Sequence, residues 1–328
     1  MNLDRFGTTA RVAGFVLGLA ALFAAALGIG AAVGPDVTAT SSGHADGHGA
    51  DGEGHVAPAG DDAAAAASLP GGLAVAQDGY ALRLASPSAQ AGAGIPVSFT
   101  VTGPDGSPVT GFDVQHEKRL HLIAVRRDQS GFQHVHPTLA ADGTWSTTLD
   151  LRPGAWRLFA DFKPTGADPL TLGADLSVAG SFTPEPPAAP SRTATVDGYT
   201  VTLTGDLVAG RDARLALTVS KDGRPVTDLD PYLGAYGHLV ALRDGDLAYL
   251  HVHPDGEPGD GRTTPGPEVV FHTAVPSAGG YGLHLDFQHQ GVVRTASFVV
   301  TATGSAADGS TPTDGSIPTR GASDGHGH

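Results

Sequence analysis

Two groups of histidines with the same spacing are the residues in this chain best suited to chemistry. The pattern His-x12-His-x-His occurs twice, at His121, His134, His136 and at His238, His251, His253. The chain has no cysteine and its single methionine is Met1, so thiolate sites and methionine-rich sites are excluded. Neutral imidazole nitrogens bind divalent first-row metals, and Cu(II) binds such sites most tightly. The pattern therefore predicts a divalent transition-metal site, with Cu(II) or Zn(II) as the ion.

A β-hairpin would bring the three histidines of each group together. Asp244-Gly245 favours a two-residue type I′ turn. With that turn His238 lies directly opposite His251, and His253, two residues further on, shares their face. The same spacing predicts the same parity in the first group. Because both faces of the hairpins are partly apolar, we expect the histidines at the rim of each sandwich interior.

Carboxylates on a later strand extend each group. Asp161 and Asp286 each begin an Asp-Phe pair, and each is expected to ligate the metal or to orient a ligating imidazole. His284 alternates onto the face of Asp286 and is a further candidate, which predicts tighter binding in the second copy. We therefore expect one metal site per copy, made by His121, His134, His136, Asp161 in the first and by His238, His251, His253, His284, Asp286 in the second.

The two histidine groups lie in an internal duplication. Residues 105–110 match residues 222–227 at an offset of 117, which is also the offset of the histidines. Asp161-Phe162 and Asp286-Phe287 are offset by 125, so the second copy has gained a loop. Each copy contains about seven short alternating strands separated by Gly, Pro and Asp. This predicts an all-β protein with two tandem immunoglobulin-like antiparallel β-sandwich domains after one N-terminal transmembrane helix.

The other segments predict how the domains are attached. Residues 12–34 carry no charge and are long enough to span a bilayer, and Arg5 and Arg11 before them place the N-terminus in the cytoplasm. The chain is then a single-pass protein of the cell membrane; a cleaved signal peptide, which would make it secreted, is the alternative. The predicted segments are the cytoplasmic N-terminus 1–11, anchor 12–34, disordered tether 35–68, domain 69–180, proline-rich linker 181–190, domain 191–302 and disordered tail 303–328.

Charge and motifs narrow the function. The formal charge of −15 argues against nucleic acid as a partner. The sequence holds no phosphate-binding loop and no nucleophile elbow, so we expect no enzymatic activity. A zinc hydrolase would need a general base, for which only Asp161 or Asp286 is evident. The leading interpretation is an extracytoplasmic protein that binds or buffers metal, with the ion and the membrane as partners and the protein partner unknown. The alternative is a metal-free tandem module for interaction or adhesion, with structural histidines.

The first histidine group also carries a family resemblance. Residues 120–125, residues 132–137 with their His-x-His-Pro motif, Pro153-Gly154 and Asp161-Phe162 resemble the YtkA-like group of histidine-rich extracytoplasmic bacterial modules. They are more distantly similar to the CopC-like copper-binding sandwiches. The resemblance implies an immunoglobulin-like fold and a role near copper handling. CopC-like proteins use a histidine at the mature N-terminus as a ligand, and this chain has none identifiable there.

Overall fold

The computed structural model describes residues 70–186 and 188–304. These residues form β-strands and no helix, and within them nothing is long and apolar enough to span a membrane as a helix. The predicted cytoplasmic segment, anchor and tether lie outside the described residues, as does the predicted tail beyond residue 304.

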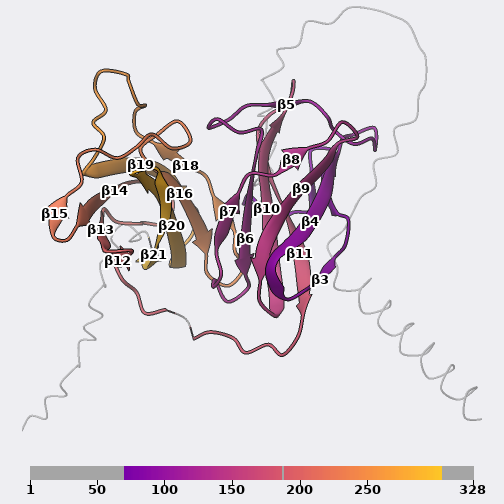
Figure 1. Ribbon diagram of the computed structural model, residues 1–328, viewed down its shortest axis with the longest axis horizontal. Helices are drawn as coiled ribbons and strands as arrows, with labels where there is room; N and C mark the ends of the chain where they lie inside the picture. The colour runs from indigo at the N-terminus through magenta and orange to yellow at the C-terminus, as the bar shows by residue number, and fades with distance from the viewer. Residues whose placement is uncertain (1–69, 187, 305–328) are drawn as a thin grey trace, which may run out of the picture. The chain divides into compact units, whose positions relative to one another are not determined.

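The first copy consists of two sheets, drawn in indigo to pink in Figure 1. One has the strand order β1-β2-β4-β9-β8, and the other has the order β3-β11-β10-β6-β7 with β5 paired to β10. All pairs are antiparallel except β3 with β11. The strands are β1 Ala76–Gln77, β2 Tyr80–Leu84, β3 Ser88–Gln90, β4 Gly92–Thr102, β5 Phe112–Asp113, β6 Leu120–Arg126, β7 Gln133–Val135, β8 Thr138–Leu139, β9 Thr144–Leu151, β10 Gly154–Pro164 and β11 Leu170–Ala179.

The second copy repeats this plan with antiparallel pairs throughout. Its sheets have the orders β12-β13-β14-β19-β18, with β15 paired to β14, and β17-β16-β20-β21. The strands are β12 Thr193–Val196, β13 Tyr199–Thr204, β14 Arg211–Lys221, β15 Arg224–Pro225, β16 His238–Arg243, β17 Tyr249–Leu250, β18 Val252–Pro254, β19 Glu268–Val275, β20 Gly279–His289 and β21 Val292–Ala302.

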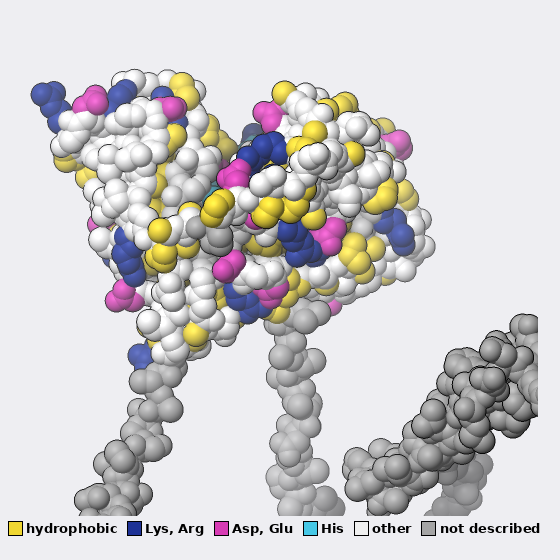
Figure 2. All heavy atoms as spheres, turned by 90° about the horizontal axis from the view of Figure 1, so that it is seen from below, with side chains coloured by type: hydrophobic (Ala, Val, Ile, Leu, Met, Phe, Trp, Pro, Cys, Tyr) yellow, Lys and Arg dark blue, Asp and Glu magenta, His cyan; other side chains and the backbone are white. Residues whose placement is uncertain are grey.

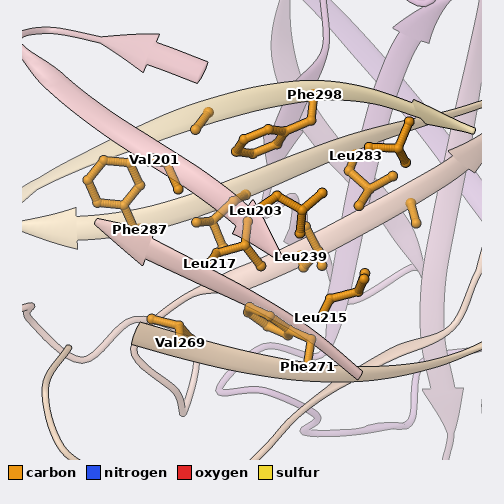
Figure 3. Packing of buried hydrophobic residues seen from close by; sticks show 14 of the residues in the cluster. Val201, Leu203, Leu215, Leu217, Leu239, Val269, Phe271, Leu283, Phe287 and Phe298 are labelled. Carbon is orange, nitrogen blue, oxygen red and sulfur yellow. The ribbon is translucent and has the colours of Figure 1, made fainter. Parts of the chain in front are cut away.

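Each copy has its own hydrophobic core between its two sheets. In the first, Phe99 and Trp145 from one sheet are buried in the same cluster as Trp156 from the other. In the second, Phe271 from β19 and Phe287 from β20 are buried in one cluster (Figure 3). Alternating strands with one face on such a core are the immunoglobulin-like architecture. The predicted pair of tandem immunoglobulin-like antiparallel β-sandwiches is confirmed, while the predicted transmembrane helix lies outside the described residues.

The strands that carry the site are buried on both faces. Every residue of β6 is buried, whereas β9 alternates between buried and exposed residues. Leu122 and Ala124 point into the core of the first copy, while Ile123 and Val125 lie in a third cluster that also contains residues of the second copy. The members of this interface cluster are Ile123, Val125, Phe159, Val240, Leu242, Leu247 and Tyr249, with Phe132 packed against them.

The histidines do not lie at the expected position, and the interface cluster shows why. His121 alternates with Leu122 and therefore shares the face of Ile123, which packs against the other copy. The histidines thus lie on the outer faces of the two sandwiches, between the copies, and not at the rim of either interior. Both faces of these strands are apolar, so the sequence did not decide which face packs on the sandwich interior and which packs on the other copy.

The histidine hairpins differ from prediction in register. Ile123 pairs with His134, which brings His121 opposite His136 and not opposite His134. In the second copy the N–H of Arg243 donates to the carbonyl oxygen of Ala248, and the carbonyl oxygen of Arg243 accepts from the N–H of Leu247. The turn is therefore longer than the expected two-residue turn. Because both registers shift by two residues, the side chains keep the predicted face.

The second histidine strand changes sheets early. In the first copy β7 stays beside β6 as far as Val135. In the second copy pairing with β16 ends at Leu250, and the next residues join the other sheet, where His253 pairs with His272. His251 and His253 therefore do not face His238, contrary to the expected arrangement.

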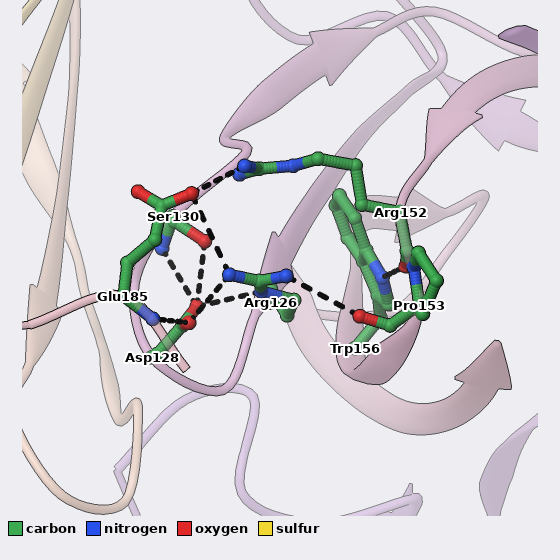
Figure 4. A network of polar contacts seen from close by, with 7 residues as sticks. All are labelled: Arg126, Asp128, Ser130, Arg152, Pro153, Trp156 and Glu185. Carbon is green, nitrogen blue, oxygen red and sulfur yellow. Dashed lines mark hydrogen bonds and ion pairs between the residues drawn. The ribbon is translucent and has the colours of Figure 1, made fainter. Parts of the chain in front are cut away.

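A polar network fixes the turn between β6 and β7 (Figure 4). Arg126 donates two hydrogen bonds to the carboxylate of Asp128, at 2.9 and 2.7 Å. Asp128 also accepts the backbone N–H of Glu185 at 2.8 Å, and Glu185 is ion-paired with Arg152. The hairpin that carries His134 is thereby tied to the segment leading to the second copy.

Candidate functional site

Imidazoles from both copies meet where their outer faces pack together. His121 is the second residue of β6 and His238 the first residue of β16. Their rings are stacked, with centroids 5.4 Å apart and planes 7° from parallel. His134 lies 4.7 Å from His238 and His136 lies 5.0 Å from His121, measured between ring centroids. We call His121, His134, His136, His238 and Asp286 the composite cluster, because both copies contribute to it.

The hydrogen-bond partners of His121 assign its tautomer. Its Nε2 lies 3.1 Å from the backbone carbonyl oxygen of Gln115. A carbonyl oxygen only accepts, so Nε2 carries the proton and donates it. In the neutral ring Nδ1 is then a bare lone pair, and it faces His134 Nε2 at 3.0 Å and His136 Nε2 at 3.2 Å.

His134 is oriented by a carboxylate from the other copy. Its Nδ1 donates to Asp286 Oδ2 at 2.8 Å, and the side chains are only 2% and 3% exposed. The other oxygen of Asp286 accepts from Thr295 Oγ1 at 2.5 Å. With its proton on Nδ1, neutral His134 presents a second lone pair at Nε2. This is the arrangement in which a carboxylate fixes the tautomer of a metal-binding histidine.

When both rings are neutral, two nitrogen lone pairs face each other at 3.0 Å with no hydrogen between them. Such a contact is repulsive unless a cation lies between the nitrogens. With metal–nitrogen bonds of about 2.0–2.1 Å, two ligands are about 3.4 Å apart at a tetrahedral centre and about 2.9 Å apart at a square one. The observed separations of 3.0 and 3.2 Å fall between these values. Small movements of the rings would admit an ion.

The second copy contributes an unpartnered nitrogen. His238 Nδ1 is buried and has no hydrogen-bond partner. Among the described residues, two triplets bring their ligand atoms within 4.8 Å of one another: His121, His134 and His136, and His134, His238 and Asp286. The triplets share His134, so one ion held by the first has His238 and Asp286 beside it.

Burial disfavours protons on the composite cluster. Desolvation, with the nearby His134 as the next cause, lowers the pKa of His121 to about 3. Desolvation likewise lowers the pKa of His136 to about 4 and brings the pKa of His238 well below its usual value. These three imidazoles are therefore neutral at pH 7, the state that binds metal.

The two aspartates occupy equivalent positions with different partners. Asp161 pairs across the strands with His121, as Asp286 does with His238. Asp161 accepts from Thr171 Oγ1 at 3.0 Å, and burial raises its pKa. It belongs to neither of the two triplets. Its expected role as a ligand is therefore not reproduced, whereas Asp286 serves the histidines of the other copy.

The remaining expected ligands lie away from the composite cluster. His284 stacks on Phe132 at 3.9 Å between centroids and its Nδ1 lies 2.8 Å from Ser297 Oγ. His251 and His253 are exposed, with ring centroids 4.4 Å apart. The expected set of five ligands in the second copy is thus not assembled.

Sequence reasoning missed the pairing of His134 with Asp286, because it treated each copy as a separate site. Apolar residues on both faces of β6 and β16 were the available signal, since a hairpin exposed on one side would alternate more strictly. The carbonyl oxygen of Gln115, which sets the tautomer of His121, is a backbone group, so no pattern of side chains could predict this contact.

A family model described as "Domain of unknown function (DUF8832)" matches the chain twice, over residues 74–178 and residues 194–304. A comparison with curated proteins gave no match. The matched family is neither of the groups that the His-x-His-Pro stretch resembles.

Several solved structures are similar to this chain at low identity. The Escherichia coli adhesin FdeC is 16% identical with a TM-score of 0.22, covering 71% of this chain and 66% of that one. The Yersinia pseudotuberculosis adhesin InvE is 14% identical with a TM-score of 0.20, covering 68% and 58%. A marsupial T cell receptor is 11% identical with a TM-score of 0.20, covering 68% and 99%. The match spans less than two thirds of either adhesin.

Proposed function

The chain belongs to the family of the Domain of unknown function (DUF8832) and contains two copies of that domain, and we propose that these two copies together bind one divalent transition-metal ion. The ion sits between the sandwiches and is held by His121, His134 and His136, with His238 and Asp286 beside it. A single composite site replaces the expected pair of separate sites.

The observation that carries this proposal is the 3.0 Å contact between His121 Nδ1 and His134 Nε2, in two rings whose other nitrogen is held by Gln115 and by Asp286. An all-nitrogen donor set without sulfur suits Cu(II) or Zn(II). Cu(II) prefers the smaller, near-square angles, and Zn(II) prefers the tetrahedral ones. A binding or buffering role without catalysis, outside the cytoplasm at the membrane, remains part of the proposal.

Calorimetric titration of the full chain with Cu(II) or Zn(II) tests the proposal, and the duplication supplies a matched control. His134→Ala/His136→Ala removes the His-x-His motif of the first copy, and His251→Ala/His253→Ala removes the same motif from the second. We expect the first variant to lose one equivalent of tight binding and the control to retain it. Equal binding by both variants, whether lost or retained, would contradict the composite site.

A metal-free interaction or adhesion module is the second candidate, and a specific feature favours it. If His134 carries a second proton, Nε2–H donates to His121 Nδ1 and the imidazolium is paired with buried Asp286. The cluster then joins the copies as a hydrogen-bonded network with no ion. In that case neither variant differs from the wild type in metal titration.

A further inference from the structure

The contact between the two copies is modest in size. The interface cluster has seven buried members, and the side-chain hydrogen bonds across it include those from His134 to Asp286 and from Gln129 to Asp244. On the face shown in Figure 2, acidic and basic side chains are interspersed, so neither copy presents a surface of one charge there. Domains joined by a modest interface are expected to move relative to each other. A further link between the copies therefore matters for the composite cluster, which takes side chains from both.

The segment that precedes the first strand provides such a link. Residues 70–73 have the sequence Pro-Gly-Gly-Leu and are bonded to strands of two different sheets. In the first copy, the carbonyl oxygen of Thr171 in β11 accepts from the N–H of Gly72 at 2.8 Å. In the second copy, the N–H of Tyr249 in the edge strand β17 donates to the carbonyl oxygen of Gly71 at 2.9 Å. We call residues 70–73 the clasp, because they are bonded to both copies.

A buried arginine fixes the clasp to the first copy. Arg157 belongs to β10 and is only 7% exposed. Its guanidinium group donates to the carbonyl oxygen of Gly72 at 2.5 and 3.2 Å and to that of Leu73 at 2.8 Å. It also donates to Asp175 Oδ1 at 3.1 Å. Charged donors form stronger hydrogen bonds than neutral ones, and the planar guanidinium reaches several acceptors at once. The first copy therefore holds the clasp firmly and presents Gly71 to the second copy.

Gly72 is the residue at which the clasp meets the interface cluster. Its φ is 73°, in the left-handed region that favours glycine. A Cβ atom at this position would lie 2.3 Å from Cδ1 of Phe159 and 3.3 Å from Cβ of Tyr249. These two residues come from different copies, and their ring centroids are 5.8 Å apart. The backbone of Gly72 thus packs against both copies at once and leaves no room for a side chain.

We propose that the clasp positions the second copy on the first, and that its displacement separates the copies and dismantles the composite cluster. When docked, the clasp holds β17, and through it β16, whose first residue is His238, against the first copy. When displaced, it leaves His121 without the ring of His238 and leaves His134 without the carboxylate of Asp286. Metal binding is then controlled by the segment that precedes the first copy. This control rests on the proposed function, whereas the positioning of the copies does not.

Alanine substitutions of two glycines in the full chain test the clasp. Gly72→Ala puts a methyl group against Phe159, whereas Gly106→Ala introduces similar backbone strain, at a φ of 78°, with nothing within 4 Å of the new Cβ. The two variants therefore differ in the contact and not in the strain. Arg157→Lys is a third variant, because it keeps the charge beside Asp175 but loses the guanidinium that holds two carbonyl groups. Far-UV circular dichroism checks that all three variants fold.

The separation of the copies is measured without metal. The chain has no cysteine, so Ser107→Cys and Arg224→Cys, at exposed and equivalent positions of the two copies, can carry a donor and an acceptor dye. In chelator-treated protein we expect a broader distribution of single-molecule energy transfer in Gly72→Ala and Arg157→Lys than in the wild type and Gly106→Ala. Calorimetric titration with Zn(II) follows on the same proteins without the dyes. We expect Gly72→Ala to bind Zn(II) about tenfold more weakly than Gly106→Ala, which corresponds to about 1.4 kcal/mol.

The two measurements separate the clasp from the proposed function. Equal transfer distributions in Gly72→Ala, Arg157→Lys and Gly106→Ala would overturn the clasp, even if all three bind Zn(II) tightly. A broader distribution with unchanged Zn(II) affinity would overturn the control of metal binding and the composite site together. If the wild type binds no Zn(II) but the distribution broadens as expected, the proposed function fails and the positioning by the clasp stands. If Gly72→Ala does not fold, Arg157→Lys decides between the same outcomes.

Discussion

Replacing His134 with alanine tests whether the composite cluster joins the two copies, with or without metal. The imidazole donates to Asp286 across the interface, and both side chains are almost fully buried. Without it the carboxylate keeps only its bond from Thr295. A buried ionised group that loses its partner costs about 3–5 kcal/mol. We take the lower end, about 3 kcal/mol, because the threonine hydroxyl still donates.

For a unit of this size, about 3 kcal/mol lowers the melting temperature by about 6–12 °C. The measurement is urea and thermal unfolding of chelator-treated protein, followed by the fluorescence of Trp145 and Trp156, both buried in the first copy. His253→Ala is the control, since its exposed ring has no side-chain partner and its loss is expected to stay within about 0.5 kcal/mol.

A second substitution separates the lost pair from the lost volume of the ring. In His134→Ala/Asp286→Asn no charge is left unpaired, so we expect this double variant to be more stable than His134→Ala alone. The coupling energy from the double-mutant cycle should then be at least about 1 kcal/mol. If His134→Ala matches His253→Ala, or if the two substitutions are additive, the cross-interface pair contributes nothing and the reasoning is wrong.

Three further predictions follow from the interface and the burial of its groups. Residues 188–304 alone should bind metal more weakly in calorimetry than residues 65–186, since three of the clustered histidines lie in the first copy; equal affinity would contradict a composite site. Val240→Asp puts a charge into the interface cluster and should abolish tight metal binding in the same titration while each sandwich keeps its far-UV circular dichroism, although no ligand is changed. Burial lowers the pKa of His284 to about 4, below about 6.5 in the unfolded chain, so its contribution to stability is present above pH 6.5 and is lost as the pH falls towards 4. His284→Phe, which introduces the residue found at the equivalent Phe159, should reduce the stability lost between about pH 7 and about pH 4.5 by about 2–3 kcal/mol in urea unfolding, and an unchanged loss would exclude His284 as its source.

The fold could be predicted because its signals are local. Alternation along each strand, turn residues between strands and the repeated offset all act over short distances, and they led to two antiparallel sandwiches. The common face of the histidines could also be predicted, since it depends only on the parity of their spacing. A register error of two residues leaves that parity intact.

What could not be predicted depends on contacts between the copies. Leu122 and Ile123 are equally apolar, so the sequence does not say which of them faces its own core and which faces the other copy. The partner of His134 lies 152 residues away in a different domain. Nothing in the spacing of the second histidine group reveals that β18 joins the other sheet after Leu250. Packing against a neighbour decides these three points.

The sheet change at β18 has a consequence for how duplicated domains diverge. In a dimer of two identical subunits on a twofold axis, every substitution occurs in both subunits, so a substitution that removes a ligand removes it from both. Joining the copies in one chain removes that constraint, and the linker between them keeps them together at a high effective concentration even when one copy contributes less to the contact. The second copy could then move its His-x-His strand to the surface while the first retained its own at the interface. Two copies joined in one chain can therefore diverge independently of each other, and they can contribute different sets of side chains to one shared site.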